Sequence, residues 1–503
     1  MKLSTSFITA ALAFSSLASA APQAEDVEAR GIIPLSSAAL QALVSRHTLL
    51  AHARQFVKFS EQSGGTRAFG SRAHNSTVRY IKTLLDATGF YDTSLQTFPY
   101  LYSSGSAEIA ANGTALASRW FTYGPSGDVS ANLVVVNNLG CDASDYPAAV
   151  EGQIALIKRG TCEFGLKTAL AGNAKAAGAI IYNNAPEPIA GGTLGSPSRE
   201  AGPYVPVGSI SGADGDRLVA DIAAGNTIAG ALKVNAVTED RYTSNVIATT
   251  KIGDKNNIVF AGGHTDSVPE GPGINDDGSG TITILDLALR LPLFNFRNAV
   301  RFGFWTAEEF GLVGSEHYVT NLPAEEQDKI AVYLNFDMVA SPNFGYFIYD
   351  GDGSAFNLTG PSGSDHVEKT FEDYFRGKNL RSAPTEFSGR SDYGPFLDVG
   401  IPSGGLFTGA EGKKTAQEAQ WWGGEAGVDY DICYHKACDG VNNLNVPAWV
   451  ENTKAAAHAI ATYARSLNGI PRGSRSANRK VSVASLSHEE RQHYSCGHEI
   501  ASL

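Results

Sequence analysis

The chain lacks an excess of basic residues. Its 39 Lys and Arg stand against 51 Asp and Glu, which gives a formal net charge of −12. That sign argues against a dedicated nucleic-acid binder, which needs a basic surface. Beyond the N-terminus the chain also lacks an uncharged run of about 18 apolar residues, the length that a membrane span needs. It has no C-x-x-C pair, which argues against a zinc–thiolate site. We therefore expect neither a nucleic-acid partner nor a membrane span.

What the chain does contain is ordinary for a globular protein. Of its 503 residues, 43% are hydrophobic and 18% are charged. This composition excludes wholesale disorder and a fibrous fold. The length exceeds what one hydrophobic core usually serves, so two domains are expected.

The N-terminus carries the pattern of a secretory signal peptide. Lys2 precedes an apolar, small-residue run from Phe7 to Leu17, which ends in Ala18-Ser19-Ala20. A short positive region, an apolar stretch and an A-x-A site are typical of such a signal. We predict a signal peptide over residues 1–20 and a secreted, extracellular protein, and we leave open whether a short propeptide follows.

Five cysteines fit an oxidising compartment, where disulfides form and persist. Cys141 and Cys162 lie close in sequence, as do Cys433 and Cys438, so these two pairings are the most economical and leave Cys496 unpaired. Three N-x-S/T sequons are candidate glycosylation sites: Asn75, Asn112 and Asn357.

The first half of the chain is predicted to form helices followed by a Gly- and Ala-rich unit. One helix is expected from Leu40 to Ser60 and another from Asn75 onward. Between about 124 and 237, short apolar runs alternate with helical stretches, which predicts a small α/β unit. The chain has no histidine between His74 and His264, so we expect this unit to be structural or to shape the substrate site.

The sequence of the second half predicts buried strands that alternate with helices. Asn257–Ala261, Ala299–Trp305 and Ala331–Phe336 are continuous apolar or aromatic runs, as in strands buried on both faces. Helical patterns at Thr281–Leu291 and Pro447–Leu467 supply covering layers. A largely parallel sheet is therefore expected. The Ser- and Arg-rich residues 471–503 are predicted to be a disordered tail.

Acidic and imidazole groups follow the ends of these predicted strands. The first strand runs into His264, a glycine-rich loop carries Asp276, the next strand precedes Glu308-Glu309, and the third ends at Asp337. Single residues of this kind also occur in turns and at helix starts. Ligand sites of open α/β sheets lie beyond the carboxyl ends of the strands, however, so the four points are expected to meet in one cleft. Such a donor set suits a pair of divalent metal ions.

Five motifs carry a resemblance to a known family. In order along the chain they are G-G-H-T-D, G-I-N-D-D-G-S-G, T-A-E-E-F-G-L-x-G-S, N-F-D-M and C-Y-H-x-x-C-D. They resemble the two-zinc aminopeptidases of the secreted fungal leucine aminopeptidase and aminopeptidase Y type, over residues 31–123 and 237–467. The resemblance implies a three-layer αβα peptidase domain with a central, mostly parallel sheet. Residues 124–236 resemble an inserted protease-associated domain with a small α/β fold.

The resemblance also implies a set of metal ligands for two zinc ions. Asp276 falls on the residue that bridges both ions, and the family's Asp276–Asp277 bond is cis. One ion would take His264 and Asp337, and the other Glu309 and His435. Glu308 matches the general base, adjacent to a ligand without being one.

Further positions match supporting parts of the family's site. Asp266 would orient the His264 imidazole, and Tyr434 resembles the residue whose hydroxyl stabilises the developing oxyanion. Arg390 resembles a substrate-positioning arginine, with a surface ion pair as the alternative. Met338 and Phe407 fall where a hydrophobic side-chain pocket is lined, although apolar residues also simply fill cores. The Cys433–Cys438 bridge would hold the loop that carries Tyr434 and His435.

The activity implied is release of N-terminal, preferentially apolar amino acids from peptides with a free N-terminus, by a monomeric hydrolase. Three alternatives stay open. A carboxypeptidase needs cationic groups that hold a free carboxylate, and no such set is evident. A glutaminyl cyclase shares the architecture but binds one zinc ion. A receptor-like ectodomain without catalysis keeps the fold and loses the chemistry.

Overall fold

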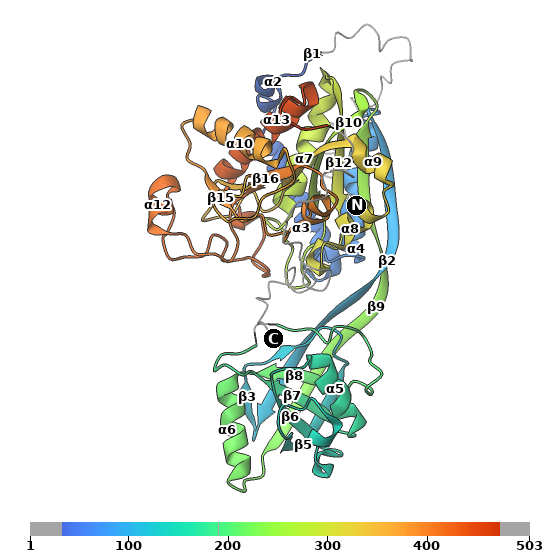
Figure 1. The fold of residues 1–503 in the computed structure, drawn as a ribbon, viewed down its shortest axis with the longest axis vertical. Helices are drawn as coiled ribbons and strands as arrows, with labels where there is room; N and C mark the ends of the chain where they lie inside the picture. Colours follow the sequence, from blue (N-terminus) through green and yellow to red (C-terminus); the bar gives the residue numbers. More distant parts are fainter. Residues whose placement is uncertain (1–32, 190, 473–503) are drawn as a thin grey trace, which may run out of the picture.

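The computed structural model describes residues 33–189 and 191–472. The predicted signal peptide (1–20), nearly all of the predicted tail and Cys496 lie outside the described residues. Figure 1 shows two units stacked along the long axis of the molecule and joined by two long strands. We refer to them as the larger unit, which contains the first and last described residues, and the smaller unit, formed around strands β5 to β8.

The two connecting strands are β2 (Tyr91–Ala111) and β9 (Ala229–Thr250). They pair antiparallel over their whole length, from Tyr91↔Thr250 to Ala111↔Gly230. The other edge of β9 pairs with β12 in the larger unit and with β5 in the smaller one. A single hydrogen-bonded ribbon thus passes through both units.

The larger unit is built on a mixed sheet. Across it, the strands are β15 (Ala383–Thr385), β14 (Phe347–Tyr349), β16 (Ser403–Phe407), β13 (Ile330–Phe336), β10 (Asp254–His264), β12 (Asn298–Trp305), β9 and β2. The four central strands, β16, β13, β10 and β12, are mutually parallel, and antiparallel pairs flank them. The three long apolar runs of the sequence are three of these central strands, as predicted.

Helices cover both faces of this sheet. Alternate residues of β10 point to opposite sides, because Val259 and Ala261 belong to one buried cluster and Ile258 and Phe260 to another. The first cluster is completed by α2 (Ser37–Gln41), α3 (Arg46–Ser60), α4 (Arg72–Ala87), α7 (Gly278–Arg290), α10 (Ser364–Gly377) and α13 (Val446–Arg465). The second is completed by α8 (Val313–Thr320) and α11 (Gly394–Asp398). The predicted three-layer αβα architecture is confirmed.

The remaining elements of the larger unit are short. They are α9 (Ala324–Lys329), α12 (Ala416–Trp422), and the two-stranded parallel sheet of β1 (Ile33–Pro34) and β11 (Phe294–Asn295). None of the described helices combines the length and the apolar character that crossing a membrane requires.

Two N-terminal helices begin elsewhere than the sequence predicts. The single helix expected over Leu40–Ser60 is two, α2 and α3, because Ser45 leaves the helical conformation and caps α3 by accepting from the His47 N–H at 3.3 Å. Helix α4 begins at Arg72 rather than at Asn75, because the Ser71 hydroxyl accepts from the His74 N–H at 3.1 Å. Both boundaries follow from a serine acting as an N-cap.

The smaller unit is a mostly parallel sheet covered on both faces. Its strands are β5 (Gly127–Val135), β6 (Ile154–Lys158), β7 (Gly178–Tyr182) and β8 (Val207–Ile210), with β4 (Arg119–Trp120) antiparallel to β8. Helices α5 (Phe164–Asn173) and α6 (Gly212–Ala223) contribute to two separate buried clusters, and β3 (Thr114–Leu116) pairs with β2. The sheet therefore draws on residues before Gly124, where the second domain was expected to begin.

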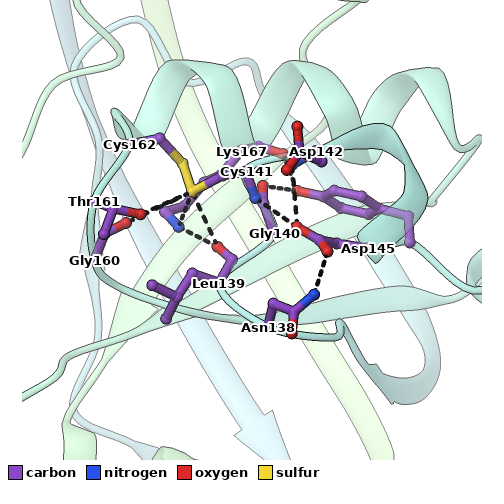
Figure 2. Close-up of a disulfide and its surroundings, with 11 residues drawn as sticks. Asn138, Leu139, Gly140, Cys141, Asp142, Asp145, Gly160, Thr161, Cys162 and Lys167 are labelled. Carbon is purple, nitrogen blue, oxygen red and sulfur yellow. Dashed lines mark hydrogen bonds between the residues drawn. A yellow bond between two sulfur atoms is a disulfide. The ribbon is translucent and has the colours of Figure 1, made fainter.

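A disulfide joins Cys141 to Cys162 in the loops after β5 and β6 (Figure 2). Lys167, on the neighbouring helix α5, is fully buried and donates to the Leu139 carbonyl and, at 3.6 Å, to Cys141 Sγ. Burial lowers the pKa of Lys167 to about 8. This lysine holds the loop after β5 against the helix.

Phe260 occupies the centre of an aromatic cluster between β10 and the second helical layer. Its ring contacts those of Trp305, Tyr333 and Phe396 with centroids 5.4–5.6 Å apart. We expect Phe260→Ala to lower the free energy of unfolding by about 3–5 kcal/mol, because the lost contacts leave a cavity. Tyr242→Ala is the control: this ring is 70% exposed, so a change below about 0.5 kcal/mol is expected. Equal denaturation midpoints for the two variants would contradict this assignment of the core.

Candidate metal centre

The carboxyl ends of the central strands bring the predicted acidic and imidazole groups together. Strand β10 ends at His264, β12 leads to Glu308 and Glu309 in a short 3-10 turn, and β13 leads to Asp337. The parallel register places these ends side by side, with His264 opposite Trp305 and Gly262 opposite Asn335. Asp276 comes from the loop between β10 and α7, and His435 from the loop that follows α12.

Asp276 lies between the two histidines. Its Oδ1 is 3.2 Å from His264 Nε2, and its Oδ2 is 3.1 Å from His435 Nε2. Asp337 Oδ1 lies 3.7 Å from His264 Nε2, and Glu309 Oε2 lies 3.0 Å from His435 Nε2. The five residues thus divide into two groups, each with one imidazole and one terminal carboxylate, which share Asp276.

The His264 ring has the environment of a metal ligand. Its side chain is only 1% exposed, yet neither ring nitrogen makes a hydrogen bond. Tetrahedral zinc with bonds of about 2.0–2.1 Å holds neighbouring ligand atoms about 3.3 Å apart. The separations around His264 and His435, 3.0–3.7 Å, match that spacing. The donor set of nitrogen and carboxylate oxygen therefore fits zinc.

The cluster is electrostatically crowded. Burial, with Asp337 as a neighbour, raises the pKa of Glu308 well above its ordinary value. Burial and the charge of Asp276 raise the pKa of Glu309 to about 7. Burial alone would lower the pKa of His264, but Glu308 and Asp337 outweigh it and raise that pKa. The carboxylates of the site are buried close together, so a metal cation bound among them would be stabilised by their negative charge.

Several backbone positions at the site lie in the left-handed region. Ala307 (φ 53°) precedes Glu308, Met338 (φ 49°) follows Asp337, and His435 itself has φ 54°. For residues with a Cβ this conformation costs about 1 kcal/mol or more and persists where the surroundings enforce it. The Asp276–Asp277 peptide bond is cis.

Asp277 ties three segments of the site together, a role that the sequence analysis did not assign. Its carboxylate accepts from the N–H groups of His264 (3.1 Å), Gly280 (2.8 Å) and Met338 (3.0 Å). It therefore links the end of β10, the start of α7 and the segment after β13. The only indication of this role in the sequence was that Asp277 lies within the motif G-I-N-D-D-G-S-G.

Asp439 is a second residue whose role the sequence did not reveal. Its two oxygens accept from the N–H groups of Asn275 (2.9 Å) and Asp276 (3.1 Å), so it fixes the backbone of the proposed bridging residue. It stands directly after Cys438, and the Cys433–Cys438 disulfide closes this loop. The motif C-Y-H-x-x-C-D already contained it.

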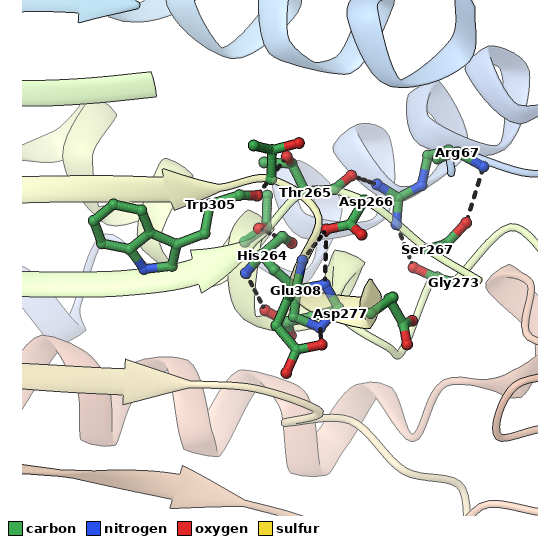
Figure 3. Close-up of polar contacts among 12 residues, drawn as sticks. Arg67, His264, Thr265, Asp266, Ser267, Gly273, Asp277, Trp305 and Glu308 are labelled. Atoms are coloured by element: carbon green, nitrogen blue, oxygen red, sulfur yellow. Dashed lines mark hydrogen bonds and ion pairs between the residues drawn. The ribbon is translucent and has the colours of Figure 1, made fainter. Parts of the chain in front are cut away.

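The other predicted site residues lie around the same cleft. Asp266 Oδ1 is 3.6 Å from His264 Nδ1 and accepts from the Glu308 N–H at 3.1 Å (Figure 3). Tyr434 is half-buried and stacks on the His435 ring with centroids 3.8 Å apart. The cleft wall is completed by residues of both polar and apolar type: Met338, Tyr349, Arg390, Tyr393, Phe407 and Glu411. Arg390 Nη1 lies 3.2 Å from Glu411 Oε1.

Buried carboxylates and imidazoles at the carboxyl edge of an open α/β sheet are typical of metal-dependent hydrolases. The comparison with known sequences gives the family. Residues 245–460 match peptidase family M28, and residues 129–218 match the PA domain. This chain belongs to peptidase family M28 and carries an inserted PA domain.

Fungal relatives resemble the chain over most of its length. It is 52% identical over 406 residues to a "probable leucine aminopeptidase 2" of Aspergillus oryzae, covering 81% of this chain and 82% of that protein. It is 47% identical over 444 residues to leucine aminopeptidase 2 of Trichophyton rubrum, covering 88% and 89%.

Solved structures share the architecture. An aminopeptidase from Aneurinibacillus sp. strain AM-1 gives a TM-score of 0.65 at 27% identity, covering 86% of this chain and 96% of that one. A zinc aminopeptidase from Bacillus subtilis gives a TM-score of 0.59 at 23% identity, covering 84% and 96%. At the latter identity the likeness concerns the fold alone.

The contacts of Asp277 lead to a stability prediction. We expect Asp277→Ala to cost about 3 kcal/mol or more in the free energy of unfolding, because three buried N–H groups lose their acceptor. Asp277→Asn should cost less, since one side-chain oxygen can still accept from Gly280 and Met338. Denaturant unfolding of the metal-free proteins measures both values. An alanine variant within about 1 kcal/mol of the parent would show that these bonds contribute little.

Proposed function

We propose that this protein is a secreted aminopeptidase with two zinc ions, which releases an N-terminal amino acid, preferentially an apolar one, from peptides. The observation that carries the proposal is the position of Asp276, whose two carboxylate oxygens face two histidines of separate groups. The names of the fungal relatives support the aminopeptidase activity.

In this proposal the ligands are the residues of the two groups. His264 and Asp337 would hold one ion, Glu309 and His435 would hold the other, and Asp276 would serve both. When bound, the two ions supply Lewis acidity, which polarises the scissile carbonyl and lowers the pKa of water.

Glu308 is proposed as the general base. It precedes Glu309, lines the cleft, and has its Oε2 3.8 Å from His264 Nε2. Its main-chain N–H donates to Asp266 Oδ1, which fixes the backbone from which the carboxylate extends. In this position Glu308 accepts a proton from the attacking water and passes it to the leaving amine.

Tyr434 and Arg390 are proposed to act on the substrate. The Tyr434 hydroxyl would donate to the oxyanion that develops on the carbonyl. Arg390, held by Glu411, would position the peptide beyond the scissile bond. The Cys433–Cys438 disulfide constrains the loop that carries Tyr434 and His435.

The apolar part of the cleft is proposed to receive the N-terminal side chain. Met338, Phe407 and Tyr349 line it, next to the metal ligands. Apolar contact there favours a leucine-type residue. The free α-amine would lie among Glu308 and Asp337, where an ammonium is attracted and an acylated amine meets no complementary charge.

Secretion, monomeric state and glycosylation complete the proposal. Two disulfides are present in the described residues, as suits an oxidising compartment. Asn112 and Asn357 are exposed, which suits glycan attachment. Asn75 is half-buried within α4 and donates to the Gly70 carbonyl at 3.4 Å, so it suits a glycan less well. Residues 31–123 and 237–467 would form the peptidase domain, and 124–236 the protease-associated domain.

Substitution of the two adjacent glutamates should affect zinc content and turnover differently. Glu308→Gln should retain two zinc ions per chain and lose about 10²–10⁴-fold in kcat, because it removes only the proton acceptor. Glu309→Gln should retain fewer ions, because it removes a ligand. Elemental analysis and steady-state kinetics measure both effects. Equal zinc loss in the two variants would reject the base assignment, and one ion in fully active parent protein would favour a cyclase-like site.

The end of the peptide that is cleaved decides the activity. We expect hydrolysis of leucine anilide, no hydrolysis of acetyl-leucine anilide, and stepwise loss from the N-terminus of a longer peptide. C-terminal amidation of that peptide should have little effect, which serves as the matched control. Mass spectrometry that detects internal cleavage, or loss from the C-terminus, would reject the aminopeptidase proposal.

A further inference from the structure

Arg67 is a fully buried cation in the N-terminal part of the larger unit. It lies between helices α3 and α4, far in sequence from the residues 245–460 that match the peptidase family. Its side chain has 0% exposure, and its guanidinium packs 5.0 Å from the Phe56 ring of α3. A buried arginine is costly unless its donors are satisfied, so the contacts of this one indicate its role.

All three side-chain nitrogens of Arg67 donate to main-chain carbonyls of one loop. Figure 3 shows Arg67 beside Thr265 and Gly273 of this loop. Nη1 donates to Thr265, next to His264. Nε donates to Pro272 at 2.8 Å and Nη2 to Gly273 at 2.5 Å, three residues before Asp276. The guanidinium therefore connects the two ends of the loop that leads from one proposed ligand to the other.

The main chain beside Arg67 strengthens the same connection. The Arg67 N–H donates to Ser267 Oγ at 2.9 Å, and the Thr66 hydroxyl donates to the Val268 carbonyl at 2.7 Å. Residues 66–67 thus contact the loop at its beginning, middle and end.

The charge of Arg67 also faces the acidic cluster. Burial lowers its pKa to about 10, while Asp266, Asp439, Asp277 and Asp276 act in the opposite direction, so the group is a cation at neutral pH. The hydrogen bonds of its side chain go to main-chain carbonyls rather than to these carboxylates. The group therefore contributes to the conformation of the loop as well as to the local electrostatic potential.

We propose that Arg67 is a positioning residue of the metal centre, which holds the loop from Thr265 to Gly273 so that His264 and Asp276 are presented together. The inference rests on the proposed function, in which Asp276 serves both ions. Without the guanidinium, three buried carbonyls lose their donors and the loop can relax away from this arrangement. Because both ions depend on Asp276, both should bind less tightly. Supporting residues of this kind typically change metal affinity 10–100-fold.

The test is the apparent zinc Kd of the full-length protein, measured by competition with a chromophoric chelator. Arg67→Met and Arg67→Lys should raise the Kd at least 10-fold, and kcat on leucine anilide should recover to within a few-fold at saturating zinc. The matched control is Arg301→Met. Arg301 donates to Thr249 on β9 (2.8 Å) and to Tyr318 on α8 (2.7 Å) rather than to a loop of the site, so its loss should lower thermal stability and leave the zinc Kd unchanged.

Circular dichroism shows whether each variant is folded. A folded Arg67→Met with a zinc Kd within twofold of the parent would overturn the proposal. If that variant does not fold, Arg67→Lys decides on the same criterion. If neither folds, Phe56→Leu decides on that criterion too, because it removes the ring that packs against the guanidinium and lets its donors shift away from the loop. Failure of the proposed function would look different: the parent itself would then bind no zinc or cleave no leucine anilide.

Discussion

Desolvation of the acidic cluster is the constraint on which the rest of the larger unit depends. Asp266, Asp276, Asp277, Glu308 and Glu309 are each at most 5% exposed, and ionised carboxylates in such a place are costly unless partners or cations compensate. The chain supplies part of the compensation itself. Asp277 accepts three main-chain N–H groups, and Asp439 supports the Asp276 backbone. The proposed zinc ions would supply the rest.

The surrounding architecture explains how such a cluster can be held in place. Four parallel strands deliver their carboxyl ends to one edge, and apolar layers on both faces make those strands stiff. Residues with positive φ at Ala307, Met338 and His435 show that the loops leaving these strands are bent to suit the site. The smaller unit adds no group to the cluster. It is attached through β2 and β9, whose continuous pairing joins it to the edge of the same sheet.

Much of this could be predicted from local sequence, and the exceptions have physical causes. The long apolar runs predicted β10, β12 and β13, because a strand buried on both faces needs such residues. The helix boundaries at Ser45 and Ser71 were missed, since a serine in a helical pattern becomes a cap only when the chain turns there. Asp277 and Asp439 stood within recognised motifs, but their partners are N–H groups from distant segments, which no pattern identifies.

The sequence alone predicted that His264, Glu308-Glu309 and Asp337 lie near one another, because each follows a visible apolar run and the carboxyl ends of such strands lie at one edge of the sheet. Asp276 and His435 stand in loops, and their place in the ligand set came from the motifs that resemble the family. Only the tertiary structure gave the distances: the Asp276 carboxylate lies 3.2 Å from His264 Nε2 and 3.1 Å from His435 Nε2, although the two histidines are 171 positions apart in the numbering. Only the tertiary structure could place Arg67 against the loop from Thr265 to Gly273. The guanidinium donates to main-chain carbonyls, which every residue possesses. The side chains of the loop therefore do not indicate which residues accept these hydrogen bonds.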